Sequence, residues 1–136
     1  SNAPEVEIIA LRDYGQLLGT GFQIVDDVLD FEGNEKTLGK PVGSDLREGI
    51  VTLPAMYYLR NHPQDDRIAR VLQDSRDEEL VGSVVAAIRE SGAVTQALDR
   101  ARDLIRQGQG ALQVLPEGKS RTALHELAEY TIDRQK

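Results

Sequence analysis

The stretch that decides the fold runs from Gly21 to Asp30 and reads Gly-Phe-Gln-Ile-Val-Asp-Asp-Val-Leu-Asp. If this stretch and its neighbours form a helix, apolar side chains lie on almost every side of it, so we expect the helix to be buried. Three carboxylates, those of Asp26, Asp27 and Asp30, stand inside it, and ionised carboxylates are costly to bury without a cation. Asp26 and Asp30 fall one helical turn apart on one face. Hard oxygen ligands that converge on one point suit Mg²⁺, so the stretch predicts a metal site. The alternative, a solvated acidic face, requires polar neighbours that this stretch lacks.

Composition limits the classes of protein to which the chain can belong. Its 136 residues, 40% of them hydrophobic and 29% charged, are typical of one small globular domain. A net charge of −7 argues against nucleic acid or an anionic membrane surface as a partner. The chain has no cysteine, so disulfides and thiolate metal sites are excluded. Because no apolar run is long enough for a membrane span and no signal peptide is visible, we expect a cytoplasmic protein.

The first three residues, Ser1-Asn2-Ala3, look like the scar of a cleaved expression tag and are set apart from the fold. Residues 4–136 are expected to form one helical domain. If the scar is real, the natural sequence begins near Pro4, and the chain is expected to be a piece of a longer protein.

Periodicity and chain breakers predict an all-α helical bundle with no strand. A long helix is expected from Glu5 to about Phe31, followed by a loop over 32–45 that contains three glycines and a proline. Loops of this length are usually functional or disordered, and the neighbouring aspartates favour function. Further helices are expected from Thr52 as N-cap to before Pro63, and over 64–72, 77–90, 93–115 and 120–135.

Basic side chains follow the three aspartates closely in the sequence, at Lys36, Lys40 and Arg47. Mg²⁺ usually takes one or two carboxylates together with substrate phosphates. A diphosphate held by Mg²⁺ on one side and a lysine on the other is stabilised as a leaving group, which favours ionisation of a carbon–oxygen bond. The alternative for Lys40 is an ordinary solvated loop lysine.

Small residues precede the aspartates, at Gly15, Gly19 and Gly21. They lower helix propensity, and their spacing indicates a face where another backbone or a substrate chain comes close. Leu18 and Phe22 beside them would give an apolar lining for such a chain.

Three motifs together resemble the trans-polyprenyl diphosphate synthases. These are FQIVDDVLD at 22–30, GKPVGSDL at 39–46 and TLP at 52–54. The resemblance is to the second aspartate-rich motif of that family and the loop after it. It continues to the end of the chain, but only the C-terminal part of a full synthase is covered. It implies an isoprenoid-synthase-type fold.

The resemblance also implies a role for each matching residue. Asp26, Asp27 and Asp30 would bind the Mg²⁺ that holds the diphosphate of the allylic substrate, with Asp26 as a direct ligand and Asp30 acting through water. Gln23 would lie along the allylic substrate, and Phe22 would border it.

Two positions of the loop after the aspartate motif concern binding of the substrate's diphosphate. Lys40 matches a lysine that contacts it, and many members have a second lysine where this chain has Ile50. This departure resembles members that make longer chains.

The parent enzyme implied by the resemblance is a long-chain prenyltransferase that condenses isopentenyl diphosphate with an allylic diphosphate. The family's first aspartate-rich motif is absent, so the fragment is expected to be inactive alone. Two alternatives remain open: a non-catalytic partner subunit, and a helical interaction module whose aspartates are only structural. Without the missing helices an apolar strip should be exposed and drive formation of a homodimer. Its expected members are Leu17, Leu18, Phe22, Val25 and Leu29.

Overall fold

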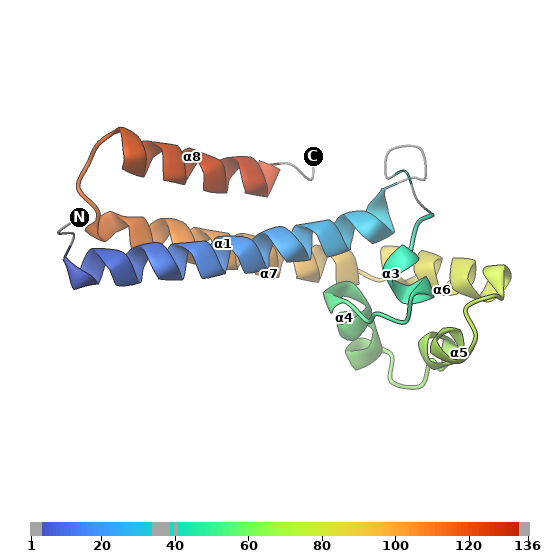
Figure 1. The fold of residues 1–136 in the computed structure, drawn as a ribbon. Coiled ribbons are helices and arrows are strands. Elements are labelled where there is room, and N and C mark those ends of the chain that lie inside the picture. The colour runs from blue at the N-terminus through green and yellow to red at the C-terminus, as the bar shows by residue number, and fades with distance from the viewer. Residues whose placement is uncertain (1–3, 34–38, 40, 134–136) are drawn as a thin grey trace. The chain divides into compact units, whose positions relative to one another are not determined.

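Every regular element in the described residues, 4–33, 39 and 41–133 of the computed structural model, is a helix (Figure 1). The α-helices are α1 (Glu5–Glu32), α3 (Ser44–Arg47), α4 (Leu53–Asn61), α5 (Arg67–Gln73), α6 (Glu78–Glu90), α7 (Ala93–Ala111) and α8 (Lys119–Asp133), and a 3₁₀ turn, η1 (Leu112–Val114), follows α7. The predicted all-α class is therefore confirmed. Within these described ranges, every helix is too short or too polar to cross a membrane.

Most helix ends lie where the chain breakers place them. Thr52 is the N-cap of α4, with a proline in the first turn, although its side chain makes no capping hydrogen bond. Asp77 caps α6 by accepting a hydrogen bond from the Leu80 amide at 3.0 Å. The main difference is α5, which begins at Arg67, three residues later than predicted. Asp65 accepts a hydrogen bond from the Arg67 amide at 3.0 Å, and this local turn occupies the start of the predicted helix.

The chain divides into two compact units, which are described separately. Unit 1 comprises Ser1–Val25 with Asp99–Lys136, and unit 2 comprises Asp26–Leu98. The expectation of a single domain over 4–136 stays a prediction.

Unit 1 joins the first part of α1, most of α7, and α8, which lie side by side (Figure 1). The Tyr14 hydroxyl donates a hydrogen bond to the Leu124 carbonyl at 2.6 Å and so ties α1 to α8. At Gly21 an added Cβ would lie 2.5 Å from Cγ1 of Ile105, so a glycine allows α1 to approach α7. The buried core consists of Tyr14, Ile105, Leu112, Ala128 and Ile132.

The prediction that another backbone or a substrate chain comes close is thus confirmed for Gly21, which α7 approaches, and stays a prediction for Gly15 and Gly19. A Cβ at either of these two positions would meet no atom within 4 Å. Both line a pocket between α1 and α8.

The predicted apolar strip is also only partly exposed. Val25 is 2% exposed, and Leu17, Leu18 and Leu29 are half-buried, whereas Phe22 is 43% exposed. Leu18 packs against the unit 1 core, to which α8 contributes two residues. The chain therefore covers part of the strip itself, and the strip is not continuous.

Unit 2 is built from short helices, with α3 and α6 packed on α5 and with α4 packed on α6. The apolar face of α6 supplies much of its buried surface. The buried apolar residues of these elements are Leu46, Pro54, Ala55, Tyr58, Ile68, Val71, Val81, Val84, Val85 and Ile88.

A polar cluster fixes the connection between α4 and α5. The Tyr58 hydroxyl donates to Oδ2 of Asp65 at 2.5 Å, and the Arg67 guanidinium donates to both carboxylate oxygens at 2.7–3.1 Å. The Arg67 guanidinium, followed by the Tyr58 hydroxyl, holds the pKa of Asp65 well below its usual range. The same hydrogen bond to Asp65, with burial, raises the pKa of Tyr58.

We expect Asp65→Asn to lower the free energy of unfolding at pH 7 by about 1.5–3 kcal/mol, because it removes a charged hydrogen-bond acceptor. The folded-state pKa of Asp65 lies below its unfolded value of about 3.9, so this stabilisation is present above that pH and is lost as the pH falls from about 5 toward 2. Urea unfolding of both proteins over this range is the measurement. Asp66→Asn is the matched control, since the exposed Asp66 makes no side-chain capping bond and its ion pair with Arg70 is long, at 3.9 Å, and exposed. Equal losses of unfolding free energy in the two variants would contradict the stabilising role of Asp65 in this cluster.

Candidate functional site

The three predicted metal ligands lie in the last turns of α1, which continues unbroken to Glu32. Asp26 and Asp30 are therefore one turn apart, as the sequence predicts. Their environments differ, because Asp26 and Asp27 are half-buried whereas Asp30 is 2% exposed. Two carboxylates can thus be reached from solvent and the third is enclosed.

Three consecutive residues donate hydrogen bonds to Asp30. The Gly43 amide donates to its backbone carbonyl at 2.9 Å. The Ser44 hydroxyl donates to Oδ1 at 2.8 Å, and the Asp45 amide donates to Oδ2 at 3.1 Å. Both carboxylate oxygens of Asp30 therefore bind the start of α3, and we call this arrangement the Asp30 anchor.

Gly43 has the backbone conformation that the Asp30 anchor requires. It is the N-cap of α3 with φ +78°, in the left-handed region that favours glycine. An added Cβ would lie 2.6 Å from Cγ2 of Val85 on α6. Both the backbone angle and the approach of α6 therefore favour glycine at this position.

Arg47, one of the three predicted basic side chains, lies in α3 and forms an ion pair. Its Nη1 lies 2.5 and 2.6 Å from the two carboxylate oxygens of Glu78, and its Nε donates to the Val42 carbonyl at 3.4 Å. The guanidinium lowers the pKa of Glu78. Arg47 thus ties α3 to the first turn of α6. The other two, Lys36 and Lys40, lie outside the described residues.

The donor set fits half of a Mg²⁺ site. Across 4–33, 39 and 41–133, no three His, Cys, Asp or Glu side chains are grouped so that they could hold a metal ion by themselves. Asp26 and Asp27 are nevertheless consecutive, half-buried residues of α1, and Mg²⁺ usually binds one or two carboxylates together with substrate phosphate and water.

The two predicted substrate-binding residues on α1, Phe22 and Gln23, are exposed. Phe22 borders an apolar pocket of about 340 Å³ in unit 1. Its lining consists of Gly15, Leu18, Gly19 and Phe22 from α1 and Leu127, Tyr130 and Thr131 from α8. The structure therefore brings the predicted apolar wall of Leu18, Gly19 and Phe22 together at one pocket.

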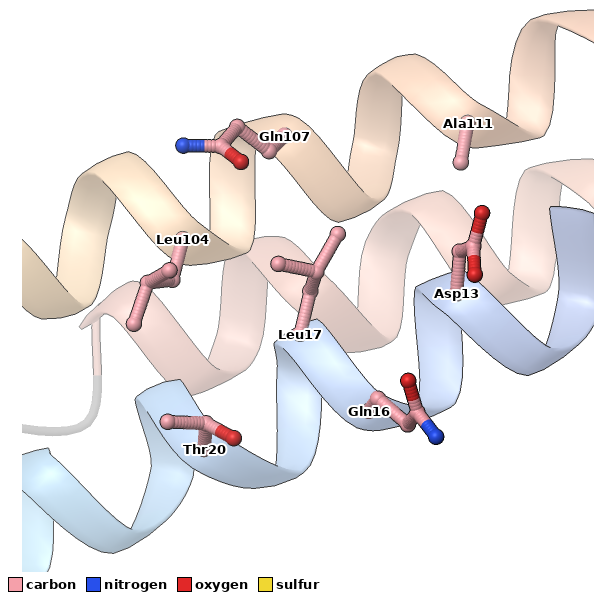
Figure 2. Close-up of a pocket in the computed structure, with 7 residues that line it drawn as sticks. All are labelled: Asp13, Gln16, Leu17, Thr20, Leu104, Gln107 and Ala111. Carbon is pink, nitrogen blue, oxygen red and sulfur yellow. The ribbon is translucent and has the colours of Figure 1, made fainter.

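A second, more polar pocket of about 530 Å³ lies between α1 and α7 in unit 1. Figure 2 shows Leu17 between the two helices, with polar side chains of both helices around the pocket. The lining residues are Asp13, Gln16, Leu17, Thr20, Leu104, Gln107 and Ala111. None of them is a predicted site residue.

Sequence reasoning missed the hydrogen bonds that Ser44 and the Asp45 amide donate to Asp30. Both lie in the GKPVGSDL motif, but their contact with Asp30 spans 14 and 15 residues of sequence. The available signal was the apolar surroundings of Asp30, which require nearby hydrogen-bond donors for its carboxylate.

The comparisons with known proteins agree on one family. The family model described as polyprenyl synthetase matches residues 1–90. The chain is 39% identical over 132 residues to octaprenyl diphosphate synthase from Haemophilus influenzae and covers 40% of it. It is 33% identical over 130 residues to heptaprenyl diphosphate synthase component 2 from Bacillus subtilis and covers 37% of it. Both matches span 96% of this chain.

Solved structures show the same partial match. Heptaprenyl diphosphate synthase from Staphylococcus aureus superposes with a TM-score of 0.89 at 32% identity, over 100% of this chain and 43% of that one. A polyprenyl synthase from Caulobacter crescentus, complexed with calcium and isoprenyl diphosphate, gives a TM-score of 0.85 at 36% identity, over 98% and 42%. The chain thus spans about two-fifths of the length of these relatives.

Proposed function

Because the chain belongs to the polyprenyl synthetase family, we propose that it is the C-terminal part of a prenyltransferase that condenses isopentenyl diphosphate with an allylic diphosphate. The observation that carries the proposal is the pair of half-buried carboxylates, Asp26 and Asp27, on a helix whose neighbouring side chains are largely apolar. The Caulobacter crescentus relative, with its calcium and isoprenyl diphosphate, supports a divalent cation and a diphosphate as ligands.

In this proposal each predicted site residue has one task. Asp26 and Asp27 hold Mg²⁺, and Asp30 binds the start of α3. Lys40 binds the diphosphate. Bound Mg²⁺ would neutralise charge on the departing diphosphate and so favour ionisation of the allylic carbon–oxygen bond.

The hydrocarbon part of the allylic substrate requires an apolar environment. Gln23 lies along this substrate, and Phe22 lines the carbon chain. Apolar walls also exclude water, which would otherwise hydrolyse a carbocation.

The remaining three-fifths of the relatives' length has no counterpart in this chain. We propose that it supplies the other half of the metal site, so the 136-residue chain alone forms no product. The names of the octaprenyl and heptaprenyl relatives favour a long-chain product. The cytoplasmic location expected from the sequence stays a prediction.

A second candidate is a subunit that works with another chain. The relative from Bacillus subtilis is named as component 2 of a heptaprenyl diphosphate synthase, which favours an assembly of different subunits. Copurification with a different prenyl synthase chain from the source organism would support this candidate.

Calorimetry tests the proposed site on the chain itself. Farnesyl diphosphate, an allylic diphosphate, is titrated into the protein with MgCl₂ present and again with the metal chelated. We expect weak binding that requires Mg²⁺. Equal binding without the metal, or none with it, would contradict the proposal.

We further propose that the chain forms a homodimer through α1. Several large apolar side chains of this helix are exposed, and such surfaces on soluble proteins usually find a partner. They are Val6, Ile8, Ile9 and Leu11. Light scattering at micromolar concentration should give twice the mass of one chain, and Ile8→Glu should reduce it toward one. A stable monomer of the unaltered chain would contradict the proposal.

A further inference from the structure

We propose that Asp30 is a positioning residue, whose carboxylate holds the start of α3 at the end of α1, and that Asp26 and Asp27 carry the metal-binding role. This inference rests on the proposed function, since it divides the tasks within the same aspartate motif. The Asp30 anchor supplies the argument.

The contacts of the carboxylate favour positioning over direct coordination. Oδ1 accepts from the Ser44 hydroxyl at 2.8 Å and Oδ2 accepts from the Asp45 amide at 3.1 Å, while the residue is 2% exposed. A metal ion bound directly would have to compete with both hydrogen bonds. Asp26 and Asp27 are more open to solvent and so more accessible to a hydrated cation.

The Asp30 anchor lies at the C-terminal end of the segment that joins α1 to α3. The segment between α1 and α3 begins where the Gly33 amide donates to the Leu29 carbonyl at 2.8 Å. It ends where the Gly43 amide donates to the Asp30 carbonyl at 2.9 Å. Both ends are thus bonded to neighbouring residues of α1, and the Asp30 side chain reinforces the second end.

Substitution by asparagine separates the two roles. The Asn side chain keeps an oxygen that can accept from the Asp45 amide, and its NH₂ can donate to Ser44, because a hydroxyl both donates and accepts. Asp30→Asn therefore preserves the geometry of the Asp30 anchor while it removes the negative charge. A positioning role survives this change, and a direct ligand role does not.

The experiment compares Asp30→Asn, Asp30→Ala and Ser44→Ala with the unaltered chain, and uses Asp26→Asn as the example of a lost ligand. The first measurement is the calorimetric affinity for farnesyl diphosphate with MgCl₂. The second is hydrogen exchange at the Asp45 amide, which reports the Asp30 anchor directly.

We expect Asp30→Asn to bind within about threefold of the unaltered chain and to keep Asp45 protected, since both hydrogen bonds are retained. Asp30→Ala should accelerate exchange at Asp45 more than about tenfold and weaken binding. Ser44→Ala removes one hydrogen bond and leaves Asp30 intact. Its affinity and its exchange rate at Asp45 should therefore lie between those of Asp30→Asn and Asp30→Ala. The proposal is overturned if Asp30→Asn loses as much affinity as Asp26→Asn while its Asp45 amide stays protected.

The two measurements also separate this inference from the proposed function. If the unaltered chain binds no Mg²⁺–diphosphate, the proposed function fails, and exchange at Asp45 still decides whether Asp30 holds α3. Unchanged exchange in Asp30→Ala and Ser44→Ala overturns the inference, whatever the affinity. If Asp30→Ala fails to fold, as circular dichroism would show, the other two variants decide the outcome.

Discussion

Replacing Asp26 with alanine is expected to weaken Mg²⁺-dependent binding of farnesyl diphosphate by more than about tenfold, or about 1.4 kcal/mol. Asp26 is half-buried near the end of α1 and is the proposed direct ligand. Alanine removes an oxygen ligand that neither Asp27 nor a neighbouring amide replaces with the same charge. Calorimetry with a fixed excess of MgCl₂ measures the change.

Asp13→Ala is the matched control for this variant. Asp13 lies on the same helix, is exposed, and lines the polar pocket between α1 and α7 (Figure 2). The substitution changes the net charge of the chain by the same amount, so a general electrostatic effect would weaken binding in both variants. Equal affinity of Asp26→Ala and the unaltered chain would show that Asp26 is not a metal ligand.

Gly43→Ala is expected to lower the free energy of unfolding by about 2–5 kcal/mol. The left-handed φ of +78° costs about 1–2 kcal/mol for a residue with a Cβ. The new methyl group would lie 2.6 Å from Cγ2 of Val85, and such overpacking costs about 1–3 kcal/mol more. Thermal unfolding should show a melting temperature lowered by about 4 °C for each kcal/mol.

Gly49→Ala separates the two causes. Gly49 has φ +86°, and a Cβ there would meet no atom within 4 Å. This control should therefore show only the backbone strain, about 1–2 kcal/mol. If both variants lose the same stability, the close approach of α6 to Gly43 is wrong.

The helices could be predicted because their signals are local. Pro63 and the Ser91-Gly92 pair mark the ends of α4 and α6 within two residues, and Glu5 to Phe31 predicts α1 to within one residue. Caps and breakers act on the backbone of their neighbours, so their effect can be read without the tertiary structure.

The candidate site could be predicted in part. Its aspartates were found from three carboxylates in an apolar helix, a pattern within one segment of sequence. The Asp30–Ser44 hydrogen bond and the Arg47–Glu78 ion pair span 14 and 31 residues. They depend on the path of the chain between helices, which residue spacing does not determine. Val25 was wrongly expected to be exposed, because its burial depends on how helices pack.

The central claim, that this chain supplies the second aspartate-rich half of a prenyltransferase, is tested most directly by a chimera. The chain replaces the matching 40% of octaprenyl diphosphate synthase from Haemophilus influenzae, to which it is 39% identical. Incorporation of radiolabelled isopentenyl diphosphate into longer prenyl products is measured with farnesyl diphosphate and MgCl₂. We predict that the chimera elongates the substrate and that Asp26→Ala within it abolishes product. A chimera that is folded by circular dichroism, binds isopentenyl diphosphate and makes no product would contradict the claim.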